Sequence, residues 1–261
     1  GGIMMGKTGK KIIFVSLFMV VLLSTLAMAS VTSVIGQTMN DKFYDARKDR
    51  SVPKMLAVIK AIEAIPNYDK DPMLLTVLAD CYLEYADWGA SSNEKEEKLT
   101  KARTLAEAAV KLEPNNGRAN YIAGASIGRL AQYKGIVQSL FMLGDFDKYI
   151  DTAIKLLDEN DEEGRLYKTF AYIASGMRYR DVPWPLYNYK KSEEMLNQAL
   201  KLTPNYSNIY LELGYLYLKT GEKDKAKEMF QKVISSPANP KLVGAHQDSK
   251  KLAKDELDKL K

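Results

Sequence analysis

The sequence predicts an all-α protein, a right-handed helical-repeat solenoid of about five antiparallel helix pairs closed by a C-terminal capping helix. Apolar side chains recur at steps of three and four residues, and no segment shows the convincing alternation of a strand. Proline followed by asparagine recurs as a turn marker, at Pro66-Asn67, Pro114-Asn115 and Pro204-Asn205. Small or apolar side chains share one spacing before two of these turns: Ala102, Ala106 and Ala109, then Ser192, Leu196 and Ala199.

The first 29 residues read as a secretory signal peptide. Three lysines between residues 7 and 11 precede an apolar run from Ile12 to Ala29, and residues 27–29 (Ala-Met-Ala) fit the small-x-small cleavage pattern. The run is also long enough to reach across a bilayer, so an uncleaved anchor over residues 12–35 is an alternative. Either way, we expect the body of the protein outside the cytoplasm, in the periplasm or another exported location.

Residues 30–261 read as one solenoid domain, because each helix pair needs its neighbour to cover its apolar face. Turn prolines are 48 residues apart between Pro66 and Pro114 and 90 apart between Pro114 and Pro204, so the middle units are enlarged. The predicted pairs occupy residues 38–65, 70–112, 117–158, 161–202 and 206–236. A last helix, at about 241–260, is expected to turn Leu252, Leu257 and Leu260 inward and its lysines outward, which closes the exposed end.

The clearest unit runs from Pro204 to Pro237. Its first helix, at about 207–219, carries Tyr210, Leu213, Gly214 and Tyr217 on one face, and its second, at about 223–235, carries Ala226, Phe230 and Val233. Gly214 and Ala226 are small where the two helices cross, so the backbones are expected to approach closely. Gly221 after Thr220 ends the first helix with a residue that tolerates the left-handed conformation.

This unit resembles the tetratricopeptide repeat, whose period is about 34 residues. The resemblance rests on Leu-Gly at 213–214, Tyr217, Ala226, Phe230 and the proline at the following turn. It implies two antiparallel helices per unit and a concave surface, lined by the first helices, that binds partners. Gly124 is a candidate for the close-approach glycine of an earlier unit.

A narrower resemblance covers roughly residues 70–237. A helix ending in aromatics and arginine, then Val-Pro-Trp at 182–184, then a helix with Ala-Leu and Pro-Asn, is similar to two groups. One is the exported T-component of bacterial tripartite (TRAP-type) transporters, and the other is the eukaryotic regulator-of-microtubule-dynamics group. The signal-like N-terminus favours the bacterial group, although the cysteine of a lipoprotein is missing after the signal.

Composition argues against catalysis, metals and nucleic acid. Cys81 and His246 are the only cysteine and the only histidine, and the sequence has no nucleophile-elbow, zinc-protease or phosphate-loop motif. Without residues 1–29 the chain has 35 basic and 33 acidic residues, which gives no nucleic-acid footprint. We therefore expect a binding protein with no cofactor, with Cys81 as a buried apolar residue.

Aromatic and arginine side chains on the first helices are the candidate binding residues, because these residue types dominate binding hot spots. The alternative is that they pack between helices. The candidates are Tyr121, Arg129, Tyr133, Tyr172, Arg178, Tyr179, Trp184 and Tyr215.

Three of the candidate segments have two readings each. Trp184, between two prolines, is either tucked over helix ends or presented at a ligand mouth. Arg178 and Arg180 either bind a carboxylate bidentately or pair with Asp181 and other acids. The apolar segment 135–143 is either core or a subunit contact.

The predicted partner is another protein, such as a periplasmic solute-binding protein, or a small apolar or carboxylate ligand. Leu211, Tyr215 and Leu218 on the inner face favour an apolar groove or self-association over a clamp for charged peptide tails. The membrane is expected to be contacted only through the N-terminal segment. A TRAP-associated adaptor is the leading hypothesis, and a cell-envelope scaffold for protein assembly is the alternative.

Overall fold

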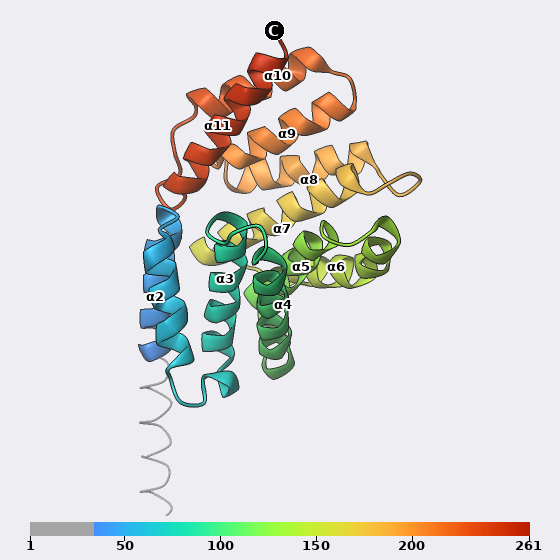
Figure 1. The fold of residues 1–261 in the computed structure, drawn as a ribbon. Helices are drawn as coiled ribbons and strands as arrows, with labels where there is room; N and C mark the ends of the chain where they lie inside the picture. Colours follow the sequence, from blue (N-terminus) through green and yellow to red (C-terminus); the bar gives the residue numbers. More distant parts are fainter. Residues whose placement is uncertain (1–33) are drawn as a thin grey trace, which may run out of the picture.

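The computed structural model describes residues 34–261, and every regular element in that range is helical (Figure 1). The predicted signal segment 1–29 lies outside the described residues. A helix covers residues 34–48, which we call helix 34–48, and a short 3₁₀ turn covers Tyr68–Lys70. The remaining helices are α2 (Val52–Glu63), α3 (Pro72–Trp88), α4 (Lys95–Leu112), α5 (Gly117–Ala131), α6 (Ile136–Leu156), α7 (Glu162–Asp181), α8 (Tyr189–Leu202), α9 (Ser207–Lys219), α10 (Lys223–Ser235) and α11 (Val243–Lys259).

The helices pack as consecutive pairs, which confirms the predicted helical-repeat solenoid. Extensive contacts join α3 with α4, α5 with α6, α7 with α8, and α9 with α10, and α4 also packs against α5 of the next pair. In addition, α3 touches α5, α5 touches α7, and α7 touches α9. These four first helices therefore form a continuous inner row, and α4, α6, α8 and α10 form an outer row.

Helix boundaries follow from short polar side chains at the turns. Asp71 accepts the backbone N–H groups of Met73 (2.8 Å) and Leu74 (3.0 Å) at the start of α3. The start of α7 is capped by Asp161, and those of α5 and α8 by the amide oxygens of Asn116 and Asn188. These oxygens satisfy N–H groups that have no partner inside the helix. Gly221, with φ of 80°, follows α9 in the left-handed conformation.

Small residues at helix crossings let the pairs pack closely, as predicted. A Cβ atom on Gly214 would lie 2.4 Å from the ring of Phe230, and Ala226 on α10 is fully buried. A Cβ atom on Gly124 would likewise lie 2.8 Å from the Ile150 side chain. Cys81 is fully buried on α3, where burial raises the pKa of its thiol.

The capping helix α11 is present, but the expected orientation of its leucines is partly wrong. Leu252 is 45 % exposed, and the fully buried residue on this helix is its neighbour Ala253, which fits the narrow space beside α9 and α10. The apolar groove expected at Leu211, Tyr215 and Leu218 is present only in part, because Leu211 is buried and the other two are half-buried. These side chains belong to the cluster in which α9 packs against α10 and α11.

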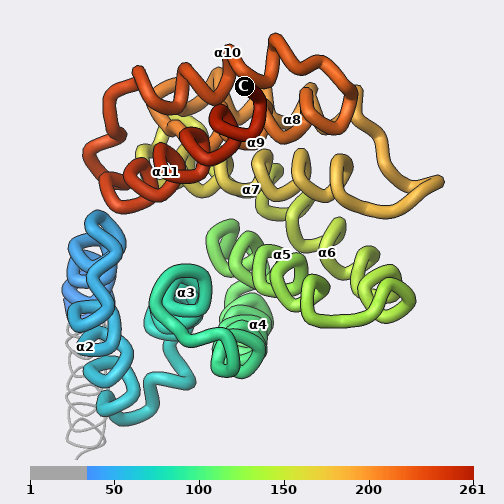
Figure 2. The backbone as a smooth tube through the Cα atoms, turned by 45° about the horizontal axis from the view of Figure 1, so that its top comes forward, coloured from blue at the N-terminus to red at the C-terminus, as the bar shows by residue number. Residues whose placement is uncertain are grey.

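The described chain curls until its last helix meets the turn that follows helix 34–48 (Figure 2). Arg50 forms an ion pair with Asp248 of α11. A second ion pair joins Lys241 Nζ to Glu162 Oε2 (2.8 Å) at the start of α7. The backbone of Asp49 lies so close to Gly244 that a Cβ atom there would be only 2.9 Å away. Among the helices of residues 34–261, none is both long enough and apolar enough to cross a membrane.

Candidate functional site

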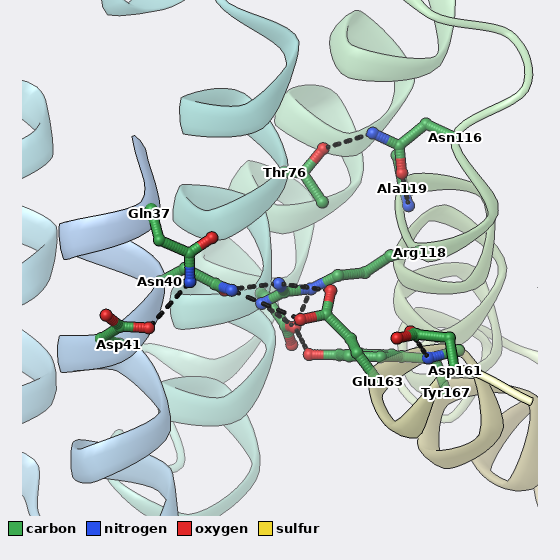
Figure 3. A network of polar contacts seen from close by, with 12 residues as sticks. Gln37, Asn40, Asp41, Thr76, Asn116, Arg118, Ala119, Asp161, Glu163 and Tyr167 are labelled. Carbon is green, nitrogen blue, oxygen red and sulfur yellow. Dashed lines mark hydrogen bonds and ion pairs between the residues drawn. The ribbon is translucent and has the colours of Figure 1, made fainter. Parts of the chain in front are cut away.

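Helix 34–48 lies across the inner row and contacts three successive repeat units. It is amphipathic: Asn40, Phe43, Ala46 and Arg47 are buried, whereas Asp41, Lys42, Asp45 and Lys48 are exposed. Asn40 reaches Arg118 of α5 and Glu163 of α7, and Gly36 lies against Met73 of α3. Figure 3 shows these elements meeting around one polar cluster. In this part of the inner row, the protein's own helix occupies the surface.

Arg118 is the centre of the cluster in Figure 3. Its Nε atom donates to Asp80 Oδ2 (3.0 Å), and its Nη1 atom donates to Asn40 Oδ1 (2.6 Å) and Glu163 Oε1 (3.2 Å). Its Nη2 atom also lies 2.9 Å from Asp80 Oδ2, but the N–H bonds there are not aimed at that oxygen. One arginine thus links helix 34–48, α3, α5 and α7 in a buried site, where breaking an ion pair costs most.

A second buried arginine, Arg47, lies beside the first. Its Nη1 atom donates to the hydroxyl of Tyr167 (3.1 Å), which in turn donates to Asp80. Its guanidinium lies 4.7 to 5.6 Å from the ring centres of Phe43, Tyr44, Tyr167 and Phe170, within cation–π range. The Nε and Nη2 atoms of Arg47 are buried without a hydrogen-bond partner, so the packing of helix 34–48 is imperfect.

The balance between burial and nearby charge shifts the pKa values of two acids, Glu163 and Glu84, in opposite directions. Burial acts to raise the pKa of Glu163, but the charge of Arg118 and hydrogen bonds from Asn40 and Arg118 outweigh it, so that pKa is lowered. The pKa of Glu84 is raised by burial, against the attraction of Arg47. Burial also raises the pKa of Tyr206 to about 12, so this residue stays a neutral phenol at physiological pH.

Beside the occupied part, the inner row keeps a surface that is partly open to solvent. Arg129 of α5, with 38 % of its side chain exposed, donates to Asp87 of α3 (3.0 Å). Tyr121, Phe170 and Tyr206 form an aromatic row that crosses α5, α7 and the start of α9, with ring centres 5.5 to 5.9 Å apart. We call Asp87, Tyr121, Arg129 and Tyr206 the open inner surface. This surface combines charged and aromatic side chains, and these residue types contribute most of the binding energy in protein–protein interfaces.

The structure brings only some of the predicted site residues together. Tyr121 and Arg129 share the open inner surface, and Tyr172 packs partly buried in the core between α7, α8 and α9. Arg178 is already engaged: its Nε and Nη2 atoms bind both oxygens of Asp147 at 2.9 and 2.7 Å, and it lies over the ring of Tyr179. Arg180 is likewise bound to Asp181 and Glu212.

Two other predicted residues, Tyr133 and Trp184, lie at the tips of neighbouring helix hairpins and are exposed. Trp184 is 79 % exposed in the loop between α7 and α8, so its side chain faces solvent and does not pack over the helix ends. At the start of α6, Phe141 is 83 % exposed, so segment 135–143 is not core within the described chain. The exposed side chains at these tips, which we call the apolar rim patch, are Tyr133, Ile136, Val137, Leu140, Phe141, Trp184, Leu186 and Tyr187.

Tyr215 lies apart from the other candidates. It packs edge-on against Phe230 and borders a shallow hollow of about 340 Å³ with Arg180, Asp181, Leu218 and Lys219. Arg180, which borders this hollow, is already paired with Asp181 and Glu212. Within residues 34–261 no group of three or more histidine, cysteine, aspartate or glutamate side chains could hold a metal ion.

The sequence reasoning missed the buried polar cluster itself. Its strongest signal is Asp80, a lone acid in the apolar run LLTVLADCYL, because an isolated buried carboxylate needs a cation. The cations near Asp80 are Arg118, at the start of α5, and Arg47, on the buried face of helix 34–48. Glu163, in the first turn of α7, also belongs to the cluster.

Proteins similar to this chain come from mouse and rat. Both are regulator of microtubule dynamics protein 2: the Mus musculus protein is 24 % identical over 202 residues, and the Rattus norvegicus protein is 24 % identical over 192 residues. The matches cover 71 % and 67 % of this chain but 48 % and 45 % of those proteins, so the chain spans about half their length. A solved structure of a mutant of the protein MamA aligns over 77 % of this chain and 96 % of its own, with 14 % identity and a TM-score of 0.35.

These relatives overturn the predicted localisation. The sequence reading placed the body of the protein in the periplasm or another exported compartment, on the strength of residues 1–29. Mouse and rat cells have no periplasm, and the relatives are named for the dynamics of microtubules, which are structures inside eukaryotic cells. The predicted periplasmic or exported location is therefore wrong.

A family model described as regulator of microtubule dynamics protein 1-3 matches residues 39–261. The match begins inside helix 34–48 and continues through α11, so it includes the residues of the polar cluster and all the helices of the inner row. Of the two groups that the sequence resembled, the eukaryotic one is thus the one supported. The chain belongs to the family of regulator of microtubule dynamics proteins 1-3.

Proposed function

We propose that this protein is a non-enzymatic adaptor that binds other proteins through the open inner surface of its helical repeats. The observation that carries the proposal is the set of Asp87 on α3, Tyr121 and Arg129 on α5, and Tyr206 at the start of α9, all partly open to solvent. A repeat array exposes this face as one continuous surface, and repeat proteins commonly use it for binding. The names of the relatives extend the proposal to a partner class, tubulin or proteins that bind it.

The transporter-associated alternative has less support. A carboxylate ligand was one of two readings of Arg178 and Arg180; in the structure both guanidinium groups bind acids of the chain itself, as in the other reading. Of the apolar groove expected on α9, Leu211 is buried against α10 and α11, and Tyr215 and Leu218 border only a shallow hollow. Association with a tripartite transporter and self-association through the apolar rim patch therefore stay predictions.

A charge exchange on the open inner surface tests the proposed function. Arg129→Asp alone breaks the ion pair with Asp87, whereas Arg129→Asp with Asp87→Arg restores an ion pair in the reversed direction. The readout is the growth rate of microtubules from purified tubulin, with a binding measurement by co-sedimentation. If tubulin contacts the charges of Arg129 and Asp87, both variants should lose at least about tenfold in affinity for tubulin, equivalent to about 1.4 kcal/mol.

The control is Lys101→Asp on α4 of the outer row, which should bind and act like the unchanged protein. Recovery of binding in the double variant would mean that the pair only supports the fold, and it would count against the proposal. Unchanged tubulin binding and microtubule growth in both variants would contradict it as well.

A further inference from the structure

We infer that helix 34–48 is a resident, displaceable ligand of the inner row, and that the surface beneath it accepts helical partner segments with the pattern Asn-x2-aromatic-x3-Arg. This inference rests on the proposed function and names the partner chemistry of the neighbouring part of the same surface. The pattern is that of Asn40, Phe43 and Arg47, the three side chains with which the helix enters the inner row.

The first argument is the position of the helix. The first helix of a regular unit packs against its own second helix and against the next unit. Helix 34–48 shares a buried core with α2 and α3 through Phe43 and Ala46. In addition, it makes hydrogen bonds to α5 and α7, through Arg118, Glu163 and Tyr167. It therefore lies across several units, as an amphipathic helix lies in the groove of a partner protein.

The second argument is the complementarity of the surface beneath the helix. Asp80 and Glu163 supply negative charge, and Tyr167 supplies a hydroxyl that accepts from Arg47. Arg118 donates a hydrogen bond to the amide oxygen of Asn40. The ring of Phe43 is fully buried, with the guanidinium groups of Arg47 and Arg118 lying over it. A foreign helix needs an amide, an aromatic ring and a cation at the same three positions to satisfy these groups.

The third argument is that the resident helix fits imperfectly. Two nitrogen atoms of Arg47 and the hydroxyl of Tyr44 are buried without partners. A partner helix whose arginine finds hydrogen-bond partners for these two nitrogens can compete with the resident helix, even though attachment gives the resident an effective concentration of about millimolar.

A disulfide can lock the helix in place in the full chain. A Cβ atom at Gly36 would lie 3.2 Å from the Cγ atom of Met73, the position that the sulfur of a cysteine would occupy. Gly36→Cys with Met73→Cys therefore brings the two sulfur positions close to bonding geometry. The native Cys81 is fully buried and should not compete for this bond.

Hydrogen exchange in the full chain shows whether the helix opens by itself. Amides of residues 34–48 should exchange at least about tenfold faster than those of α5 and α7 in the unchanged protein, as expected of an independently opening unit. Oxidation of the double-cysteine variant should remove that difference, and α10 is the internal control. Equal protection of residues 34–48 and α5 in the unchanged protein would overturn the inference, because the helix would then open only with the whole molecule.

A peptide supplied in trans tests the partner pattern. The probe is a fluorescent peptide of residues 34–51, added to the full chain with Arg47→Ala, which weakens the resident helix. The unchanged peptide and a Lys42→Ala control peptide should bind alike, and an Arg47→Ala peptide should bind at least about tenfold more weakly. The oxidised double-cysteine chain should bind none of them.

Equal binding of all three peptides, or no binding at about 1 mM, the effective concentration of the attached helix, would overturn the inference. The result is independent of the tubulin test of the proposed function: peptide exchange can succeed where the Arg129 and Asp87 variants leave tubulin binding unchanged. In that case the open inner surface fails as the tubulin-binding site, while exchange of helix 34–48 for a segment of the same pattern is still supported.

Discussion

At the scale of single residues, the protein is organised around two arginines in its interior. Arg47 is only 2 % exposed and Arg118 only 7 %, and removing a guanidinium from water is costly unless acids and hydrogen bonds replace the water. Asp80 and Glu163 supply that replacement for Arg118, and the aromatic rings around Arg47 supply part of it. The energetic consequences of this arrangement can be measured.

Replacing Asp80 with alanine should destabilise the protein strongly. The change leaves Arg118 and the hydroxyl of Tyr167 without their shared acceptor in a buried site, and breaking such a pair costs about 3 to 5 kcal/mol. Urea unfolding followed by circular dichroism measures the loss. Asp258→Ala, which removes an exposed ion pair with Lys261, should leave the midpoint unchanged. Equal midpoints for the two variants would show that the cluster does not contribute to stability.

The lowered pKa of Glu163 predicts an acid-sensitive fold. A carboxyl with a lower pKa in the folded state contributes stability above its ordinary pKa of 4.5, and this contribution is lost as the pH falls from there through the lower, folded value. The free energy of unfolding should therefore decrease as the pH drops below about 4.5. In Glu163→Gln this part of the pH dependence should be absent, and urea titrations between pH 3 and 7 compare the two. Parallel curves would disprove the assignment.

At the scale of helices, the sequence predicted most of the structure because the signals were local. The five predicted pairs and the last helix agree with the observed bounds to within a few residues, since proline, asparagine and glycine mark the turns directly. Leu252 was misplaced because two faces of an isolated helix can look equally apolar. Which face is buried depends on α9 and α10, as Ala253 shows.

Two glycine substitutions separate close packing from helix propensity. Gly214→Ala puts a Cβ atom 2.4 Å from Phe230 and should cost about 1 to 3 kcal/mol through overpacking, despite the gain in propensity. Gly144→Ala, inside α6 with no atom within 4 Å of the new Cβ, should stabilise by about 0.5 to 1 kcal/mol. Thermal unfolding of both variants gives the comparison. A stabilising Gly214→Ala would mean that α9 and α10 do not cross as described.

At the scale of the whole molecule, the sequence was less informative because the relevant contacts are distant. Arg50 pairs with Asp248, and Asn40 contacts Glu163, across separations of 198 and 123 residues that no local pattern reveals. For the same reason, two predicted site residues, Tyr121 and Arg129, lie on the open inner surface, whereas Tyr215 and Trp184 lie elsewhere. The mistaken localisation came from an apolar run whose composition fits more than one role.

The central claim is that partners bind to the inner row and not to the outer helices. A photo-crosslinking amino acid at Ala125, half-buried on α5, and another at Asn197, exposed on α8, places one probe on each surface. With tubulin added, cross-linking should occur from position 125, should be much weaker from position 197, and should fall when Arg129→Asp is introduced. Cross-linking from position 197 alone, or equal cross-linking from both positions, would contradict the account.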